Sequence, residues 1–248
     1  MLIFDKLNLL LFLMNIVITG ATKGIGRAIA DLFATREQGR LAIAARTEAD
    51  LQRLSASFAE HYPQMEVLAC CTDLSSEAGV DRFAQLILQK WEHIDVLVNN
   101  AGAFIKGGIL EEPDDALAQM LALNLVAPYR LTRALLPLML NQGYGHIFNI
   151  ASIAGRKIFA DSAAYTISKH ALIGFSGVLR EWLKTRQIKV TTVMPGHTWS
   201  QSWEGSTLPP QRILAAEEVA LAVYNAWKTA PGTVIEEIIL RPQLGDLS

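Results

Sequence analysis

Short runs of apolar and β-branched residues alternate with longer amphipathic stretches along the chain of 248 residues. The short runs are nearly continuous in apolar residues, as strands covered on both faces of a sheet are. The longer stretches predict helices. The predicted strands are Asn15–Thr19, Leu41–Ala45, Met65–Cys71, Ile94–Val98, His146–Ala151, Ile188–Met194 and Glu237–Leu240, and the predicted helices are Gly24–Glu37, Ala49–His61, Glu77–Trp91, Leu125–Asn141, Ala163–Thr185 and Ala216–Thr229.

This alternation of strand and helix predicts an α/β fold. Right-handed helical crossovers between parallel strands give a doubly wound, mostly parallel seven-stranded sheet with helices on both faces. No repeat, low-complexity tract or Pro/Ser-rich linker divides the chain. We therefore predict a single Rossmann-type domain over residues 15–248, preceded by an apolar extension over residues 1–14.

Composition excludes several classes of function. The formal net charge is −2 and 51% of the residues are hydrophobic, which favours neither a disordered chain nor a nucleic-acid-binding protein. Cys70 and Cys71 are adjacent and cannot join distant segments, and one of them is expected to face the core. The five histidines show no metal-ligand spacing, so we predict no metal site. This use of cysteine is typical of the reducing cytoplasm.

The segment TGATKGIG, residues 19–26, lies between the first predicted strand and the first predicted helix. Ligands of doubly wound sheets bind at the carboxyl ends of the strands. Glycines there permit a tight turn and the close approach of a pyrophosphate, which then lies at the helix N-terminus. A plain strand-to-helix turn is the alternative. The residues that we predict to bind a dinucleotide here are Gly20, Thr22, Lys23, Gly24, Ile25 and Gly26.

Charged residues near the second predicted strand indicate which dinucleotide binds. NAD sites usually carry an acidic residue about twenty residues beyond the glycines. This chain has Arg46 at that point and no acid at the strand end. Arg46 and Lys23 can hold a 2′-phosphate, which favours NADP(H) over NAD(H). The alternative is that both are ordinary surface charges.

Polar and small residues follow the third and fourth predicted strands. Asp73 is placed to accept hydrogen bonds from adenine amino or backbone groups, and it can also cap the next helix. The Asn99–Gly102 segment lies where the cofactor is expected to cross the sheet. A generic Asn/Gly turn would have the same sequence.

The second half of the chain carries the candidate chemistry. Tyr165 and Lys169 share one face of a predicted helix, and Ser152 ends the fifth predicted strand. A free tyrosine titrates at about 10, so we expect the lysine ammonium, helped by a positive nicotinamide ring, to lower this pKa. Tyr165 can then exchange a proton with a substrate oxygen that Ser152 orients, while hydride moves to or from the nicotinamide. For the pair alone, a buried tyrosine beside a lysine is the alternative.

Together these motifs resemble the short-chain dehydrogenase/reductase family, in the subgroup marked by TGxxxGxG and YxxxK, from about Asn15 to the C-terminus. The resemblance implies a catalytic set of Asn124, Ser152, Tyr165 and Lys169. Asn124 would hold a helix kink and a water that relays protons to Lys169, which would also hold the nicotinamide ribose hydroxyls.

The resemblance also implies the remaining cofactor contacts and the assembly. A homodimer or homotetramer is expected, with Leu125–Asn141 and Ala163–Thr185 at the interface. Ser200 stands where the family pattern has threonine, and the hydroxyl is kept. The implied cofactor-binding residues beyond the glycine segment and Arg46 are Asp73, Leu74, Asn100, Ala101, Gly102, Tyr165, Lys169, Pro195, Gly196 and Thr198.

The expected substrate is a small-molecule carbonyl or alcohol, and a loop over Thr198–Arg212 is expected to cover it. The candidate lining residues are Phe104, Phe159, Trp199 and Trp203, which fit a flat or apolar substrate unless the tryptophans only cover the core. Trp203 and the tail from Val234 to Asp246 are similar to bacterial sepiapterin reductases, which makes Asp246 a candidate pterin contact.

Other functions remain open on the sequence alone. One is a reductase of 3-oxoacyl or other small carbonyl substrates. Another is a cofactor-sensing binding protein, which would predict a broken Tyr165 or Lys169, and neither is broken.

The apolar leader Met1–Leu13 resembles a membrane signal at first sight. A helix over residues 1–14 reaches only about 21 Å, whereas the hydrocarbon core is about 30 Å thick. Asp5 and Lys6 interrupt it, and no small-residue cleavage site precedes Asn15. We therefore expect no membrane partner and take Met14 as the native start, or the leader as a dispensable extension.

Overall fold

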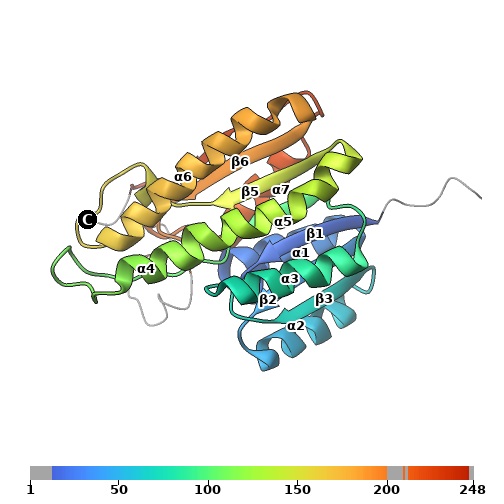
Figure 1. The fold of residues 1–248 in the computed structure, drawn as a ribbon, viewed down its shortest axis with the longest axis horizontal. Coiled ribbons are helices and arrows are strands. Elements are labelled where there is room, and N and C mark those ends of the chain that lie inside the picture. The colour runs from blue at the N-terminus through green and yellow to red at the C-terminus, as the bar shows by residue number, and fades with distance from the viewer. Residues whose placement is uncertain (1–12, 200–208, 210–211, 246–248) are drawn as a thin grey trace, which may run out of the picture.

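Strands and helices alternate through the part of the chain that the computed structural model describes, residues 13–199, 209 and 212–245 (Figure 1). The strands are β1 (Met14–Thr19), β2 (Gly39–Ala45), β3 (Met65–Cys71), β4 (Val96–Asn99), β5 (Gly145–Ile150), β6 (Ile188–Pro195) and β7 (Glu237–Leu240). The α-helices are α1 (Gly24–Arg36), α2 (Glu48–His61), α3 (Glu77–Lys90), α4 (Ala116–Leu121), α5 (Ala127–Gln142), α6 (Ala163–Leu183) and α7 (Ala216–Trp227).

The strands form one sheet in the order β3-β2-β1-β4-β5-β6-β7. Every pairing is parallel, which confirms the predicted doubly wound sheet and makes it wholly rather than mostly parallel. The order reverses between β1 and β4, so their carboxyl ends flank the switch point where such sheets bind ligands.

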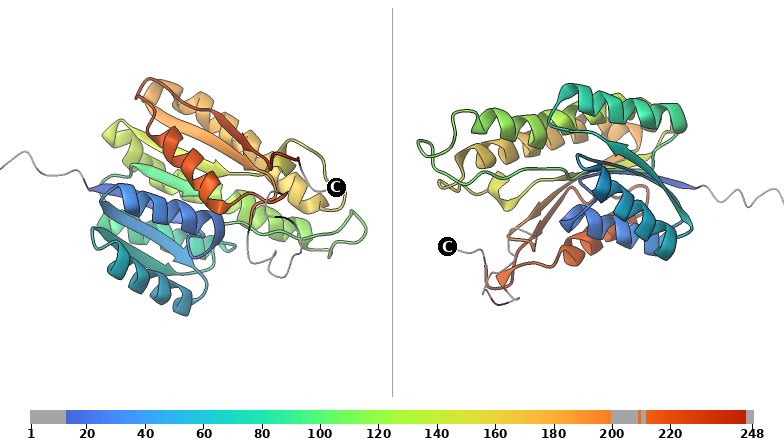
Figure 2. Two further views of the ribbon diagram at one scale, coloured as in Figure 1. Left: turned by 180° about the vertical axis from the view of Figure 1, so that it is seen from behind. Right: turned by 90° about the horizontal axis from the view of Figure 1, so that it is seen from below.

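Helices cover both faces of the sheet, as Figure 2 shows. Alternate residues of β1 pack against the two helix layers. Ile16 and Ile18 pack with Phe33 of α1, whereas Val17 packs with Leu135 of α5. The first layer also contains α2 and α7, and the second contains α3 and α6. Burial on both faces explains why the sequences of the central strands are nearly continuously apolar.

The prediction was incomplete between β4 and β5. It began a helix at Leu125, but α4 precedes that point and a π-helical segment, Ala122–Val126, joins it to α5. A π turn interrupts the spacing of apolar residues, so the pattern did not reveal one helix running through it. Pro128 lies in the first turn of α5 and has no N–H to donate back into the preceding π turn.

Two smaller predictions can also be compared with the structure. Cys70 is buried and Cys71 is exposed, which confirms that one cysteine faces the core. Met14 is buried and is the first residue of β1, one residue before the predicted strand start. Residues 1–12 of the predicted extension lie outside the described residues. Among the described helices, none combines the length and the apolar character needed to cross a membrane.

Candidate active site

The turn after β1 requires glycine at specific positions. Gly20 and Gly24 have φ angles of 68° and 57°, in the left-handed region that favours glycine. A Cβ atom on Gly26 would lie 2.3 Å from the Gly20 carbonyl oxygen and 2.4 Å from Nδ2 of Asn100. The absence of that atom lets α1 begin directly against the turn.

The amino end of α1 has the character of an anion site. Lys23 is the N-cap residue and makes no side-chain capping hydrogen bond, and no acidic residue lies in the first turn. The positive end of a helix dipole binds phosphate through backbone N–H groups. The open turn at Gly24, where an added Cβ would meet nothing within 4 Å, leaves room for it. These residues fit the pyrophosphate of a dinucleotide.

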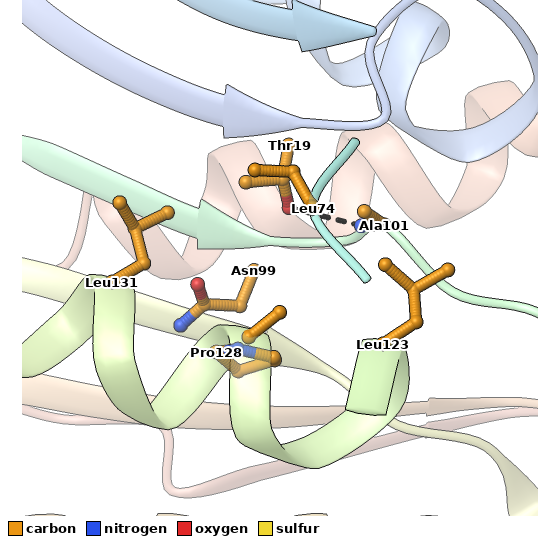
Figure 3. A pocket seen from close by; sticks show the side chains of 8 residues that line it. Thr19, Leu74, Asn99, Ala101, Leu123, Pro128 and Leu131 are labelled. Carbon is orange, nitrogen blue, oxygen red and sulfur yellow. Dashed lines mark hydrogen bonds between the residues drawn. The ribbon is translucent and has the colours of Figure 1, made fainter. Parts of the chain in front are cut away.

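Hydrogen bonds fasten the ends of β1 and β4 together at the switch point. Thr19 Oγ1 accepts from the backbone N–H groups of Asn100 and Ala101, both at 2.9 Å, and Figure 3 shows the second bond. Asn100 Nδ2 donates to the carbonyl oxygens of Thr19 (2.9 Å) and Gly20 (3.1 Å). Asn100, predicted as a cofactor contact, therefore also holds the glycine turn in place.

A cavity of about 10 Å³ lies between these strand ends and the start of α5 (Figure 3). Its lining is mostly apolar and includes Leu74, Leu123 and Leu131. About one water molecule fits a cavity of this size, so it is too small for a substrate.

Arg46 and Asp73 lie close together beyond the ends of β2 and β3. The pKa of Asp73 is held below its usual value, first by the hydrogen bond from the Ser75 backbone N–H (2.9 Å) and also by the positive charge of Arg46. Ser76, not Asp73, caps α3, with its Oγ accepting from the Gly79 N–H at 3.1 Å. The Asp73 side chain is exposed at the edge where the adenosine end was predicted.

Lys169 points into the interior at the end of β5. Its side chain is only 5% exposed, and Nζ donates to the Ile150 carbonyl oxygen at 3.0 Å. Burial lowers the pKa of Lys169 to about 8. Nζ lies 5.7 Å from the centroid of the Tyr165 ring, and a Cβ atom on Gly102 would lie 3.6 Å from it. The structure thus brings these three predicted residues together.

Tyr165 and Ser152 are also brought together. Burial raises the pKa of Tyr165, and a side-chain hydrogen bond with Ser152 acts in the opposite direction. Ser152 Oγ accepts from the Ala154 N–H at 3.1 Å. Without a bound nicotinamide, the cost of burying the phenolate exceeds the help from Ser152. The lowering expected with the cofactor bound stays a prediction.

Asn124 lies in the π-helical segment and is fully buried. Its Oδ1 accepts from the Ala103 N–H (2.8 Å), and its Nδ2 donates to the Ala103 carbonyl (3.1 Å) and to Ser168 Oγ (2.9 Å). Ser168 Oγ in turn donates to the Tyr165 carbonyl at 2.8 Å. Asn124 thus connects the segment after β4 to the helix of Tyr165, at a helix irregularity such as the resemblance implied. The water that Asn124 would hold to relay protons to Lys169 stays a prediction.

The end of β6 supplies the predicted carboxamide segment. Gly196 donates its N–H to the Leu240 carbonyl at 2.7 Å, and Thr198 Oγ1 donates to the Gly196 carbonyl at 3.0 Å. These bonds fix the turn after Pro195 at the same edge of the sheet as the glycine turn.

The structure describes only some of the candidate substrate residues. The Phe104 ring meets the Tyr165 ring edge-on, with centroids 5.0 Å apart. Phe159 lies under the Lys157 ammonium at 5.4 Å, and Trp199 is 48% exposed on the turn after β6. Trp203 and Asp246, together with Ser200, lie outside the described residues.

Thr19 was recognised as the first residue of the glycine motif, but its bonds to Asn100 and Ala101 were not predicted. Sequence reasoning missed two further residues that shape the site, Ser168 and Glu112. They gave no usable signal, because their partners Asn124 and Ala164 are 44 and 52 positions away in the chain.

The chain is similar to proteins of known class. The family model for short chain dehydrogenases matches residues 14–208. The sepiapterin reductase of Chlorobaculum tepidum is 34% identical over 94% of this chain and 97% of that protein. Dehydrogenase/reductase SDR family member 7B of Bos taurus is 36% identical over 73% of this chain, which matches 57% of its length.

Solved structures agree with this similarity. A metagenomic short-chain oxidoreductase in complex with NADP is 32% identical, with a TM-score of 0.79 over 93% of this chain and 97% of that one. The L-sorbose reductase of Gluconobacter frateurii, complexed with NADPH and L-sorbose, is 26% identical, with a TM-score of 0.84 over 93% of this chain and 95% of that one. From the family match and these full-length similarities, the chain belongs to the short chain dehydrogenase family.

Proposed function

We propose that the protein is an NADP(H)-dependent oxidoreductase that interconverts a carbonyl and a secondary alcohol, with Tyr165 as general acid and base. The observation that carries this proposal is the convergence of Tyr165, Ser152 and Lys169 at the edge of the sheet where the glycine turn of β1 also ends. In a doubly wound sheet, that edge is the one that binds ligands.

NADP(H) is the proposed cofactor. The turn from Gly20 to Gly26 and the amino end of α1 would hold its pyrophosphate, and Asp73 would lie at its adenine. Arg46 and Lys23, both exposed next to this turn, would hold the 2′-phosphate. The complexes of the metagenomic relative with NADP and of L-sorbose reductase with NADPH support this choice.

Bound NADP(H) supplies or accepts the hydride at the substrate carbon. In the reductive direction, Tyr165 donates its phenolic proton to the carbonyl oxygen, and Ser152 hydrogen-bonds the same oxygen and orients it. Lys169 has a pKa of about 8, so it is mostly an ammonium at neutral pH. That charge would favour the phenolate that forms on Tyr165 and would oppose the effect of burial.

A pterin carbonyl is the proposed first substrate to test. The similarity to sepiapterin reductase over nearly the full length of both chains supports it. Phe104 lies against Tyr165 and offers an aromatic edge to a flat ring system. A 3-oxoacyl or other small carbonyl compound is the alternative.

The test follows NADPH and NADH oxidation against pterin, diketone, quinone and 3-oxoacyl substrates. We expect NADPH to be preferred and Arg46→Ala to raise the KM for NADPH about tenfold or more, because a charge-assisted bond contributes about 1.5–3 kcal/mol. Arg53→Ala is the matched control, since Arg53 pairs with Asp50 on α2 and is 78% exposed. Preference for NADH would refute the roles of Arg46 and Lys23.

The protein is also proposed to form a homodimer or homotetramer through α5 and α6. Exposed apolar side chains support it: Tyr129 on α5 is 42% exposed, and Val178 and Trp182 on α6 are 70% and 47% exposed. A monomeric mass by light scattering would refute this assembly. The cytoplasmic location inferred from the cysteines stays a prediction.

A further inference from the structure

The helix that carries Tyr165 does not cap its own amino end. Ser162, the N-cap residue of α6, makes no side-chain capping hydrogen bond. The segment between β4 and α4 supplies acceptors instead. Ala163 donates its N–H to the Gly107 carbonyl at 3.1 Å, and Ala164 donates to both carboxylate oxygens of Glu112 at 3.0 Å.

The backbone conformation of the loop allows the Glu112 side chain to reach α6. Gly107 has a φ of 154°, and a Cβ atom there would lie 2.8 Å from Cγ of Glu112. Gly107 also forms a parallel β-bridge with Ser162 and donates its N–H to the Asp161 carbonyl at 2.8 Å. Glycine at this position therefore lets the loop lie against the start of α6 while the Glu112 side chain reaches Ala164.

Tyr165 is the third residue of α6 and directly follows Ala164. The same loop carries Phe104, whose ring lies 5.0 Å from the Tyr165 ring. Near its start, the loop is fastened at Ala103 by Asn124. The loop thus contacts the tyrosine ring through Phe104 and the backbone before it through Glu112.

We propose that Glu112 is a positioning residue, whose carboxylate caps α6 from the neighbouring loop and thereby holds Tyr165 in place for proton transfer. A carboxylate suits this place because it satisfies an N–H of the first turn and complements the positive end of the helix dipole. The inference rests on the proposed role of Tyr165 as the proton donor.

Steady-state kinetics of three variants test the role of Glu112. In Glu112→Ala, we expect kcat to fall about 10- to 100-fold with the Kd for NADPH nearly unchanged, because a misplaced acid slows the reaction without weakening cofactor binding. Glu112→Gln keeps an acceptor oxygen and should stay within about threefold of the wild type. Glu111→Ala is the matched control, since the Glu111 carboxylate accepts from Gly108 N–H inside its own loop and should leave kcat unchanged.

Hydrogen exchange of the Ala164 amide separates this proposal from the proposed function, because it needs no turnover. We expect faster exchange in Glu112→Ala than in the wild type and in Glu112→Gln.

If the wild type turns over no carbonyl substrate, the proposed function fails. Exchange of the Ala164 amide at the same rate in Glu112→Ala and the wild type would then overturn the cap as well. With turnover present, the proposal is overturned by wild-type kcat in Glu112→Ala, by an equal loss in Glu111→Ala, or by an equal loss in Glu112→Gln. If Glu112→Ala does not fold, Glu112→Met keeps the length of the side chain without an acceptor and replaces it.

Discussion

The two edges of the sheet carry polar residues of similar kinds but use them differently. At the amino edge, Asn15 is fully buried and satisfies its neighbours: its Oδ1 accepts from Arg40 Nε at 2.8 Å and its Nδ2 donates to the His93 carbonyl at 2.9 Å. Asp95 accepts from the Asn15 N–H at 2.7 Å and bonds the Tyr144 hydroxyl. These groups pair with one another, so their burial is compensated by hydrogen bonds.

At the carboxyl edge, the burial of one polar group, the Lys169 ammonium, is costly instead. Burial raises the pKa of Tyr165 and lowers that of Lys169, so the charged form of each is disfavoured. Within the described part of the chain, Lys169 Nζ donates one hydrogen bond, whereas Lys189 at the amino end of β6 donates to the Thr229 carbonyl and hydroxyl and to the Ala230 carbonyl. Burial also lowers the pKa of Lys189, but its three hydrogen bonds offset that cost. We infer that burying Lys169 trades stability for chemistry and burying Lys189 does not.

The largest expected effect is on turnover. Tyr165→Phe should lower kcat by about 10²- to 10⁴-fold, because it removes the general acid, while NADPH binding persists. Steady-state assays and NADPH titration measure this. Turnover within tenfold of the wild type would contradict the assignment of Tyr165.

Lys169→Met should lose most of its turnover and yet be as stable as the wild type or more so. Burial lowers the pKa of Lys169 from 10.5 to about 8 in the folded protein, so the unfolded chain binds the proton more tightly. Burial of the charged lysine therefore lowers the unfolding free energy by about 3 kcal/mol by linkage. This cost is complete below pH 8 and disappears as the pH rises to 10.5. Urea unfolding at several pH values should show that the variant lacks this rise in stability.

Lys189→Met is the matching change at the amino edge, and the opposite result is expected. Its three charge-assisted hydrogen bonds are lost, which should cost about 1–3 kcal/mol of unfolding free energy. Turnover at a temperature well below the unfolding midpoint should be unchanged. A gain in stability would contradict the distinction between the two edges.

The smallest effect is expected for Tyr144→Phe. Burial and the neighbouring Asp95 carboxyl raise the pKa of Tyr144 to about 12, so its phenol stays protonated and serves only as a hydrogen-bond donor. Loss of that bond should cost about 1 kcal/mol and leave kcat unchanged. A loss of turnover as large as that of Tyr165→Phe would show that the two phenols are not functionally distinct.

Local pattern predicted most of the fold because the central strands are buried on both faces and the helices on one. The strand β3 and the helix starts at Gly24, Glu77 and Ala163 have the predicted bounds. The pattern failed around Asn124, where a π turn disrupts the spacing on which helix prediction depends. The glycine turn was recognisable because its requirement for positive φ is a property of single residues.

The sequence by itself determined the strand and helix alternation, the glycine turn and the spacing of Tyr165 and Lys169, since each depends on residues near one another in the chain. Only the tertiary structure decided how these residues are buried and what they contact. It made burial the main influence on the pKa of Tyr165 in the protein without cofactor, joined Asn124 to Ser168 and placed Glu112 at the start of α6. Desolvation and hydrogen bonds between distant segments exist only once the chain has packed, so no local pattern carries them.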